Sequence, residues 1–243
     1  VFLGRALQTV NPADASVGTS QLAATSVTAA KLNNDIISGQ TALAVAPADT
    51  DEFLLSDAGT LKRIDYSLIK SDPTHVLLST TTVSSAVAAV DFTSNIDSTY
   101  DIYMVDIFGV HPSVDSSQFD LRFFQGGTIV TSSIYDSMTD NYRANNASQN
   151  FSRRENDPQI RIAPDVDTNS TASLNSRVFI YNPSDTTYNT HVSYQTSHQG
   201  QSDALFASNG GGRIESTTAV DGFRFMFDTG NIETGTFKLY GVN

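Results

Sequence analysis

Aromatic side chains are distributed very unevenly along this chain. Only three of its 14 Phe and 9 Tyr precede His75, namely Phe2, Phe53 and Tyr66. Aromatic side chains bury large areas, so the parts of the chain before and after His75 cannot build the same kind of core. We therefore divide the chain into a front part, residues 1–76, and a back part, residues 77–243.

The front part begins with a short repeat of apolar residues. They recur every five positions, as Val17, Leu22, Val27, Leu32 and Ile37. Neither a single helix nor a strand keeps that spacing on one face. Extended Ser-Val pairs alternating with one-turn, Thr-capped helices would fit, and three such chains wound about one axis would bury the column. Two hypotheses stay open for residues 1–40: a trimeric shaft that follows the end of an attachment module, and a disordered linker.

Turn residues divide residues 41–76 into a small hairpin or neck region. The expected arms, Glu52–Leu55 and Leu61–Ile64, flank an Asp-Ala-Gly turn. Tyr66–Ile69 is predicted to form a helical turn. Pro73 marks the expected hinge, because proline biases the residue before it away from helix.

The back part is predicted to be all-β. Short runs of β-branched and aromatic residues with period-2 alternation are separated by Gly, Asn and Pro turns. The expected strands are Val76–Ser79, Val83–Phe92, Tyr100–Phe108, Gln118–Phe123, Thr128–Ser133, Ile160–Ile162, Arg177–Tyr181, Thr190–Thr196, Gly222–Phe227 and Thr236–Tyr240. Such a series predicts an antiparallel β-sandwich of jelly-roll type. Two long polar stretches, Asp136–Pro158 and Gln195–Gly212, are predicted to be loops.

Composition argues against several function classes. A net charge of −12 and a pI near 4.5 argue against a nucleic-acid binder, which needs basic patches. The chain has no cysteine, so disulfides, thiolate zinc sites and cysteine nucleophiles are excluded. No apolar stretch approaches the ~18 residues of a membrane span, and we expect no membrane insertion. The first residue is Val, and Val1–Leu3 resembles the end of a strand, so we expect further chain before it.

Both ends of the sequence resemble known proteins. The opening consists of Leu3-Gly-Arg-Ala-Leu-Gln-Thr-Val-Asn-Pro12, Asp14-Ala-Ser-Val-Gly-Thr-Ser-Gln-Leu22 and Ser26-Val-Thr-Ala-Ala-Lys-Leu32. It resembles the tail-fibre proteins of tailed bacteriophages, especially marine ones, in which a small attachment module precedes Ser-Val-Thr-x-x-Lys-Leu repeats. The C-terminal sandwich of such proteins is similar to Arg177-Val-Phe-Ile-Tyr-Asn-Pro183, Ala219-Val-Asp-Gly-Phe-Arg-Phe227 and Gly230-Asn-Ile-Glu-Thr-Gly-Thr-Phe-Lys-Leu-Tyr-Gly-Val242.

The resemblance implies a homotrimeric fibre in the phage tail of a virion. A preceding N-terminal module would dock on other virion proteins, and the C-terminal domain would face outward towards a glycan or protein of the bacterial cell surface. The pattern carries no catalytic residue, and we expect no enzyme activity, no cofactor and no metal. Two alternatives stay open: a head fibre or capsid-decorating protein, and a polysaccharide depolymerase, which requires two facing carboxylates.

Candidate receptor-binding residues cluster in and beside the first long polar stretch. Sugars are recognised by flat apolar rings together with neutral hydrogen-bonding groups. The candidates are Tyr135, Tyr142, Asn145, Asn146, Phe151, Arg153 and Arg154. Other roles stay open: Tyr142 and Phe151 pack down to anchor the loop or line a trimer interface, and the two arginines pair with carboxylates of a neighbouring subunit.

Three further patterns favour structural roles. Asp165-Val-Asp-Thr-Asn169 has the D-x-D-x-N opening of a calcium loop, but it lacks the following Gly and the Glu at the twelfth position, so we predict a polar turn. Gly210-Gly-Gly212 lacks the strand and Lys of a phosphate-binding loop, and we predict a flexible loop. The scattered histidines, including His75 and His191, define no catalytic triad.

Overall fold

A computed structural model describes residues 22, 27–28, 31, 35–71, 73–144 and 148–243. The chain divides into two compact units, Val1–Ser71 and Asp72–Asn243. In the first unit, a helical turn, α1 (Asp35–Ser38), precedes the hairpin of β1 (Glu52–Asp57) and β2 (Thr60–Asp65).

The hairpin of the first unit confirms the predicted arms. β1 and β2 pair antiparallel from Glu52 opposite Asp65 to Asp57 opposite Thr60. The two central turn residues, Ala58 and Gly59, both have positive φ, as a type I′ turn requires. The predicted helical turn is also present, as the 3₁₀ helix η2 (Tyr66–Leu68).

Most apolar side chains of the first unit are exposed to solvent. Leu54 and Leu61 are 75% and 70% exposed, because an isolated two-stranded hairpin has no second layer to bury them. Among the five repeat residues, Leu22, Val27 and Ile37 are exposed in the single chain. Val17 and Leu32 lie outside the described residues.

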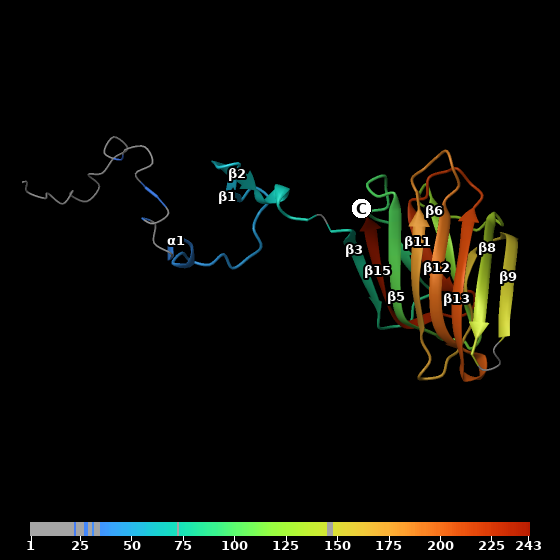
Figure 1. Ribbon diagram of the computed structural model, residues 1–243. Coiled ribbons are helices and arrows are strands. Elements are labelled where there is room, and N and C mark those ends of the chain that lie inside the picture. Colours follow the sequence, from blue (N-terminus) through green and yellow to red (C-terminus); the bar gives the residue numbers. More distant parts are fainter. Residues whose placement is uncertain (1–21, 23–26, 29–30, 32–34, 72, 145–147) are drawn as a thin grey trace, which may run out of the picture. The chain divides into compact units, whose positions relative to one another are not determined.

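The second unit is built almost entirely from strands (Figure 1). They are β3 (His75–Val83), β4 (Ala89–Phe92), β5 (Ile102–Pro112), β6 (Ser117–Gln125), β7 (Thr128–Ile129), β8 (Tyr135–Arg143), β9 (Ser148–Asp157), β10 (Ile160–Val166), β11 (Leu174–Tyr181), β12 (His191–Gly200), β13 (Ala204–Ile214), β14 (Gly222–Phe227) and β15 (Ile232–Val242). A short 3₁₀ helix, η3 (Gln201–Asp203), joins β12 to β13. The all-β prediction for this part is confirmed.

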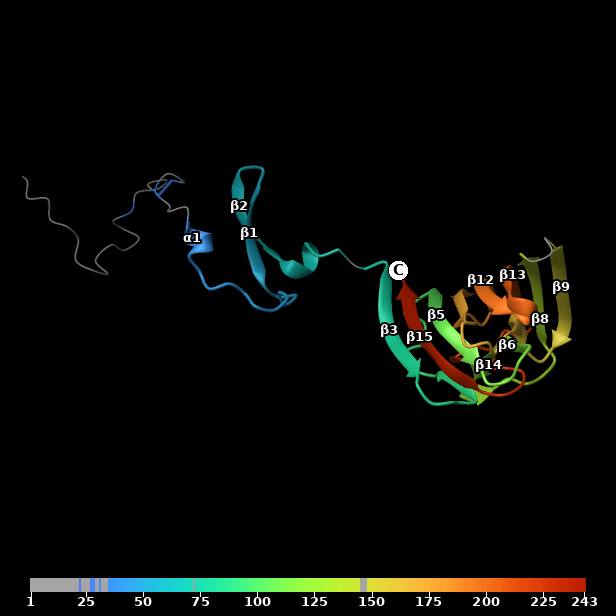
Figure 2. The same ribbon diagram turned by 90° about the horizontal axis from the view of Figure 1, so that it is seen from below.

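The strands form one curled antiparallel sheet rather than two separate sheets. Nine of them follow the order β3-β15-β5-β11-β12-β10-β6-β14-β4, a nearly closed, barrel-like path (Figure 2). A bridge between Val87 and Ile232 links the segment before β4 to β15. β10 meets β12 at a single residue pair, Val166 and Gly200. From β12 the sheet also extends sideways through β13 and β8 to β9.

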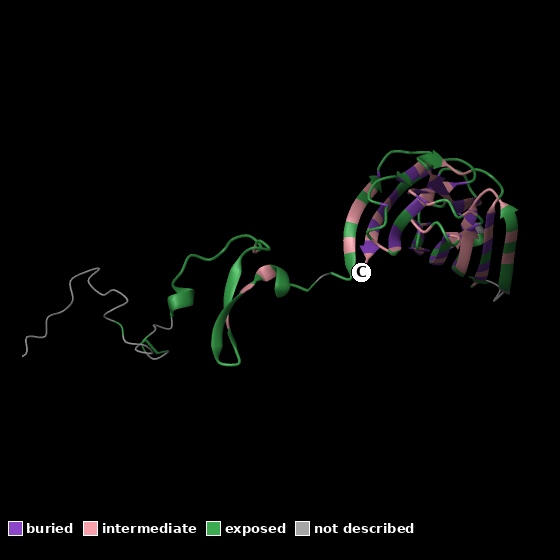
Figure 3. Ribbon diagram, turned by 90° about the horizontal axis from the view of Figure 1, so that it is seen from above, coloured by how far each residue is buried: buried purple, intermediate pink, exposed green. Residues whose placement is uncertain are grey.

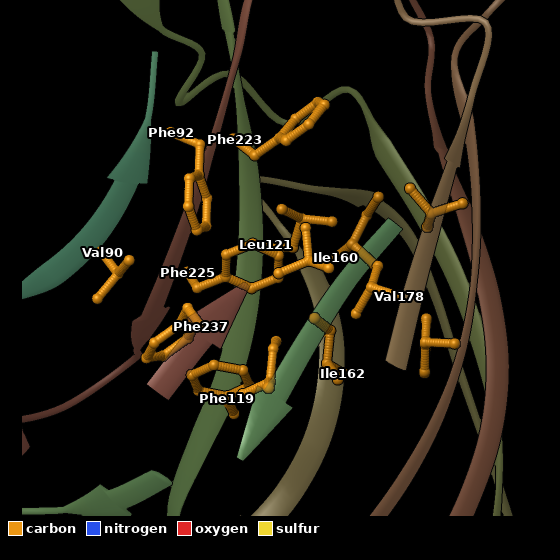
Figure 4. Close-up of a cluster of buried hydrophobic side chains, with 14 of the residues drawn as sticks. Val90, Phe92, Phe119, Leu121, Ile160, Ile162, Val178, Phe223, Phe225 and Phe237 are labelled. Carbon is orange, nitrogen blue, oxygen red and sulfur yellow. The ribbon is translucent and has the colours of Figure 1, made fainter. Parts of the chain in front are cut away.

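The curled sheet encloses an aromatic core. Buried and less buried positions alternate along the strands, as expected where one face is covered (Figure 3). Phe119, Phe223, Phe225 and Phe237 are fully buried, and their side chains converge with those of aliphatic residues such as Leu121 (Figure 4). The concentration of aromatic residues after His75 therefore supplies the interior of this unit.

Both stretches that we predicted to be loops are in fact strands. Asp136–Pro158 forms the hairpin of β8 and β9, and Gln195–Gly212 forms much of β12 and β13. Several of their inward positions, such as Ser137, Thr139, Asn141 and Thr196, carry polar instead of apolar residues, which weakens the usual alternation. These polar groups are satisfied by one another: Ser208 donates a hydrogen bond to Asn141 at 2.7 Å.

The two ends of the second unit lie side by side. β15 pairs antiparallel with β3, so that Val242 is opposite His75. The backbone N–H of Asn243 donates to the carbonyl of Thr74 at 3.1 Å. The chain therefore enters and leaves this sheet at neighbouring strands.

Candidate functional site

The outer face of β12, β13, β8 and β9 carries a hollow. We call outer the face of the sheet that is turned away from the aromatic core. Cross-strand pairing places Gly211 of β13 opposite Met138 of β8, and Met138 opposite Arg153 of β9. In the next row on the same face, Asn209 is opposite Asp140, and Asp140 is opposite Phe151.

Gly211 opens a hollow because it contributes no side chain to this face. The hollow, which we call the Gly211 groove, has a volume of about 710 Å³. Met138 and Phe151 are 60% and 66% exposed and supply apolar surface beside it. Its remaining lining includes Asp136, Asp140, His191, Asn209 and Arg213. The groove thus combines flat apolar surface with hydrogen-bonding groups.

The arginines of the Gly211 groove are paired with carboxylates of the same chain. Arg213 donates to Asp136 Oδ2 from Nε at 3.0 Å and from Nη2 at 2.8 Å. These hydrogen bonds hold the pKa of Asp136 below its ordinary value. Arg153 likewise pairs with Glu155. The walls of the groove therefore carry ion pairs rather than a field of one sign.

The structure brings together some of the predicted receptor-binding residues. Phe151 and Arg153 line the Gly211 groove with their side chains, whereas Arg154 borders it but directs its side chain to the other face of β9. Tyr142 lies on β8 and is 46% exposed, and Gln149 donates to its hydroxyl at 3.3 Å. Since Phe151 and Tyr142 face solvent, neither is packed down within this chain. Asn145 and Asn146 lie outside the described residues.

Tyr135 was wrongly predicted to lie on the surface. Its side chain is fully buried, and its hydroxyl accepts a hydrogen bond from Phe123 N at 3.1 Å. The same hydroxyl donates to Val130 O at 3.0 Å. Burial raises the pKa of Tyr135 to about 12. Its position at the start of β8 turns the ring inward, where it stabilises the core and cannot touch a receptor.

Arg153 and Arg154 both find partners within their own chain. Arg154 projects from the opposite face of β9 and pairs with Asp157 at 2.5 Å. A carboxylate from a neighbouring subunit is therefore not needed to balance either arginine. The pair of Arg213 with Asp136 was invisible in the sequence, because its two members lie far apart along the chain.

The remaining motifs are structural. In the Asp165–Asn169 motif, Asp167 accepts hydrogen bonds from the backbone and side-chain nitrogens of Asn169 at 2.9 and 3.0 Å, as in a polar turn. Among the residues that the structure describes, no group of three or more His, Cys, Asp or Glu side chains is arranged to hold a metal ion.

The glycine run Gly210–Gly212 was wrongly predicted to be a flexible loop, because it lies inside β13. Gly210 faces inward, and a Cβ there would overlap the ring of Tyr194. Gly212 also faces inward, and a Cβ there would lie 3.1 Å from the side chain of Ile160. Gly210 and Gly212 therefore leave room for the buried side chains of Tyr194 and Ile160 on the inward face. Gly211 leaves the groove open on the outer face.

Comparison with known proteins adds no assignment. No protein-family model, curated protein or solved structure matches the chain. Within the described ranges, we find no helix whose length and apolar character would let it span a membrane.

Proposed function

We propose that this chain is a virion structural protein, a trimeric phage tail fibre whose second unit contributes to attachment to the host surface. The observation that carries the attachment role is the Gly211 groove. It sets Phe151 and Met138, both largely exposed, beside the carboxylate of Asp140 and the amide of Asn209. Sugars and other neutral surface molecules offer the matching combination of apolar faces and hydroxyl groups.

The exposed repeat of the first unit supports the trimer. Leu22, Val27 and Ile37 are 48%, 54% and 83% exposed in the single chain. Exposed apolar residues at a regular spacing favour association, because burial stabilises by about 25 cal/mol per Å² of apolar surface. Three copies around a common axis would cover this column, and the opening sequence resembles fibres that are built in that way.

The electrostatics of the groove support binding rather than hydrolysis. A glycosidase requires one carboxyl group that stays protonated to act as an acid. Asp136 is held ionised by Arg213, which lowers its pKa. Burial raises the pKa of Asp120 to about 8, but this side chain is fully buried and cannot reach a sugar. We therefore rank attachment above depolymerisation.

Location on the particle is the first test of this proposal. Gold-labelled antibodies against the chain should mark the tail or baseplate in electron micrographs of the phage. Label on the capsid would contradict the tail-fibre proposal and support a head fibre or decoration protein. Light scattering of the purified chain at micromolar concentration should give a trimer mass, and a monomer would contradict the shaft.

Competition for host cells tests the attachment role. The purified chain should block adsorption of the phage to its host. Phe151→Ala should weaken the block at least fivefold, or by about 1 kcal/mol, as for an exposed ring that contacts the ligand. Phe53→Ala, which removes a half-exposed ring of the first unit, is the matched control and should block as well as the native chain. Release of reducing sugar from host polysaccharide would instead support the depolymerase.

A further inference from the structure

Two more hollows lie on the outer face next to the Gly211 groove. One, of about 340 Å³, is lined by residues that include Arg177, Phe179, Tyr181 and Gln195. The other, of about 410 Å³, is lined by residues that include Phe108, Ser197 and Ala207. Asn209 lines all three hollows. They therefore adjoin one another at Asn209, and we call the three together the trough.

The floor of the trough follows β12 and β13. Small residues face outward there, with Ser193 opposite Gly211 and Ser197 opposite Ala207. Between these two pairs, Gln195 lies opposite Asn209. From His191 to Ser197 the floor extends roughly 20 Å, at about 3.4 Å per residue. From Ser193 to Ser197 it carries hydroxyl and amide groups, and the larger side chains of His191 and Arg213 stand at its His191 end.

Apolar walls stand on the strands to either side of the floor. On β11, the rings of Phe179 and Tyr181 are stacked with their centroids 6.4 Å apart. On β8 and β9, the wall is formed by Met138 and Phe151. β11 and β8 are separated by the two floor strands, so their backbones lie about 14 Å apart at the usual strand spacing. This width accommodates a single polymer chain that runs parallel to the strands.

The arginines along the trough are already paired with carboxylates, whereas Asp140 accepts hydrogen bonds from the neutral amide of Gln149. Arg177 makes a bidentate pair with Asp106, at 2.6 and 3.0 Å. Arg213 pairs with Asp136, and Arg153 with Glu155. A charged ligand would have to break these pairs, whereas an uncharged one would meet the free amides of the floor. The trough thus matches a neutral, hydroxyl-rich ligand.

We propose that the trough binds a linear chain of uncharged sugars, several units long, that lies along β12 and β13. This inference rests on the attachment function proposed above and names its ligand class. An extended peptide would instead favour the free edge of a sheet, because the backbone groups of β12 and β13 are occupied by their neighbours. Phe179 and Tyr181 on one side and Phe151 on the other stack on sugar faces, while Gln195 and Asn209 bond their hydroxyl groups.

The test is an array of immobilised bacterial polysaccharides, neutral and acidic, probed with the full chain. We expect binding to neutral linear polymers, and affinity for their oligosaccharide fragments should rise with length until about 20 Å is filled. Asn209→Ala should lower that affinity about tenfold, as expected for lost hydrogen bonds. Ser197→Trp, which fills the floor, should abolish it. Gln40→Ala, which removes an exposed amide from the first unit, is the matched control and should bind as the native chain does.

Each other outcome overturns the inference. Binding to acidic polymers alone, binding that survives Ser197→Trp, or the absence of binding to any polymer on the array would contradict it. A lower mass of Ser197→Trp in light scattering would show that this face joins copies of the chain. The attachment function is judged separately. If the native chain and the trough variants block phage adsorption equally well, the attachment function is supported and sugar binding in the trough is contradicted.

Discussion

At the scale of single residues, two buried tyrosine hydroxyl groups connect parts of the curled sheet. Tyr194 of β12 donates to the backbone carbonyl of Arg161 in β10 at 2.6 Å and shares a second hydrogen bond with Thr139 of β8. The hydroxyl of Tyr135 in β8 accepts a hydrogen bond from the backbone N–H of Phe123 in β6. Each hydroxyl is polar yet buried, and it remains there because its hydrogen bonds offset the loss of water.

Replacing Tyr135 with Phe should destabilise the protein without affecting host binding. The substitution leaves Phe123 N and Val130 O without their partner, at a cost of about 1–3 kcal/mol. Urea unfolding monitored by fluorescence measures the loss. Tyr142→Phe is the control, because Tyr142 is exposed and should lose little stability. An unchanged stability together with lost adsorption would place the Tyr135 hydroxyl at the ligand.

His198 is a buried imidazole that stays neutral at physiological pH. It is 1% exposed and stacks on Phe206 with centroids 5.0 Å apart. Its Nε2 donates to Pro164 O at 2.7 Å. Burial lowers the pKa of His198 to about 4 from its ordinary value of 6.5. The unfolded chain therefore binds this proton more readily than the folded one.

Acid should destabilise the second unit through His198. Its contribution is unchanged above pH 6.5 and falls as the pH drops towards about 4, by about 3 kcal/mol in total. The free energy of unfolding, measured in urea between pH 4 and pH 7.5, should show this decline. His198→Gln keeps an N–H donor but cannot titrate, so its decline should be smaller by that amount. If the stability of the native protein and of His198→Gln fell equally with decreasing pH, His198 would not be the group responsible.

At the scale of whole elements, β13 is the strand whose sequence is least like a strand. Glycine weakens a strand because it is flexible and packs nothing. In β13 the same property is required, because Tyr194 lies over Gly210 and Ile160 packs against Gly212. Composition therefore predicted a loop, and only the position of the neighbouring strands explains the glycines.

Gly210→Ala should destabilise the sheet by about 1–3 kcal/mol, because its Cβ would overlap the Tyr194 ring in a packed interior. The adjacent variant, Gly211→Ala, faces outward and meets only Val192 O at 3.1 Å, so its loss should be smaller. Thermal unfolding of the two variants compares them directly. Equal losses would show that the ring of Tyr194 moves aside at little cost.

Strands with one apolar face were predictable, and strands with two polar faces were not. The predicted bounds of Gly222–Phe227 match β14, in which large apolar residues alternate with Arg and Met. β8 escaped prediction because Ser137, Thr139 and Asn141 occupy its inward positions. For the candidate site, Phe151 and Arg153 could be chosen for their chemistry. Asn209 and Gly211 could not, because only strand pairing brings them opposite β8.

At the scale of the whole molecule, the two units differ in how they are stabilised. The second unit has a continuous buried core that runs from Val83 to Leu239. In the described part of the first unit, no residue is fully buried, and apolar side chains such as Leu54 face solvent. The second unit therefore has what independent folding requires, whereas the apolar residues of the first unit are left exposed in the single chain.

Removal of residues 1–71 should leave the second unit folded but less associated. The fragment Asp72–Asn243 should unfold in one cooperative transition within a few degrees of that of the full chain, since its core is complete. Calorimetry measures the transition, and light scattering should show weaker association than in the full chain. A fragment that associates as strongly as the full chain would place the trimer contacts in the second unit.

The pairing of β15 with β3 brings the two ends of the second unit together, as in domains that can be exchanged as a whole. Because Val242 lies opposite His75, the two ends of this unit are neighbours. Units with adjacent ends tolerate insertion and circular permutation, since joining the old ends strains nothing. A permuted chain that links Asn243 to Asp72 and begins in the exposed turn at Thr186–Thr187 should keep the sheet. Under the proposed attachment function, such a domain would be replaceable at a single junction before His75, with the preceding residues unchanged.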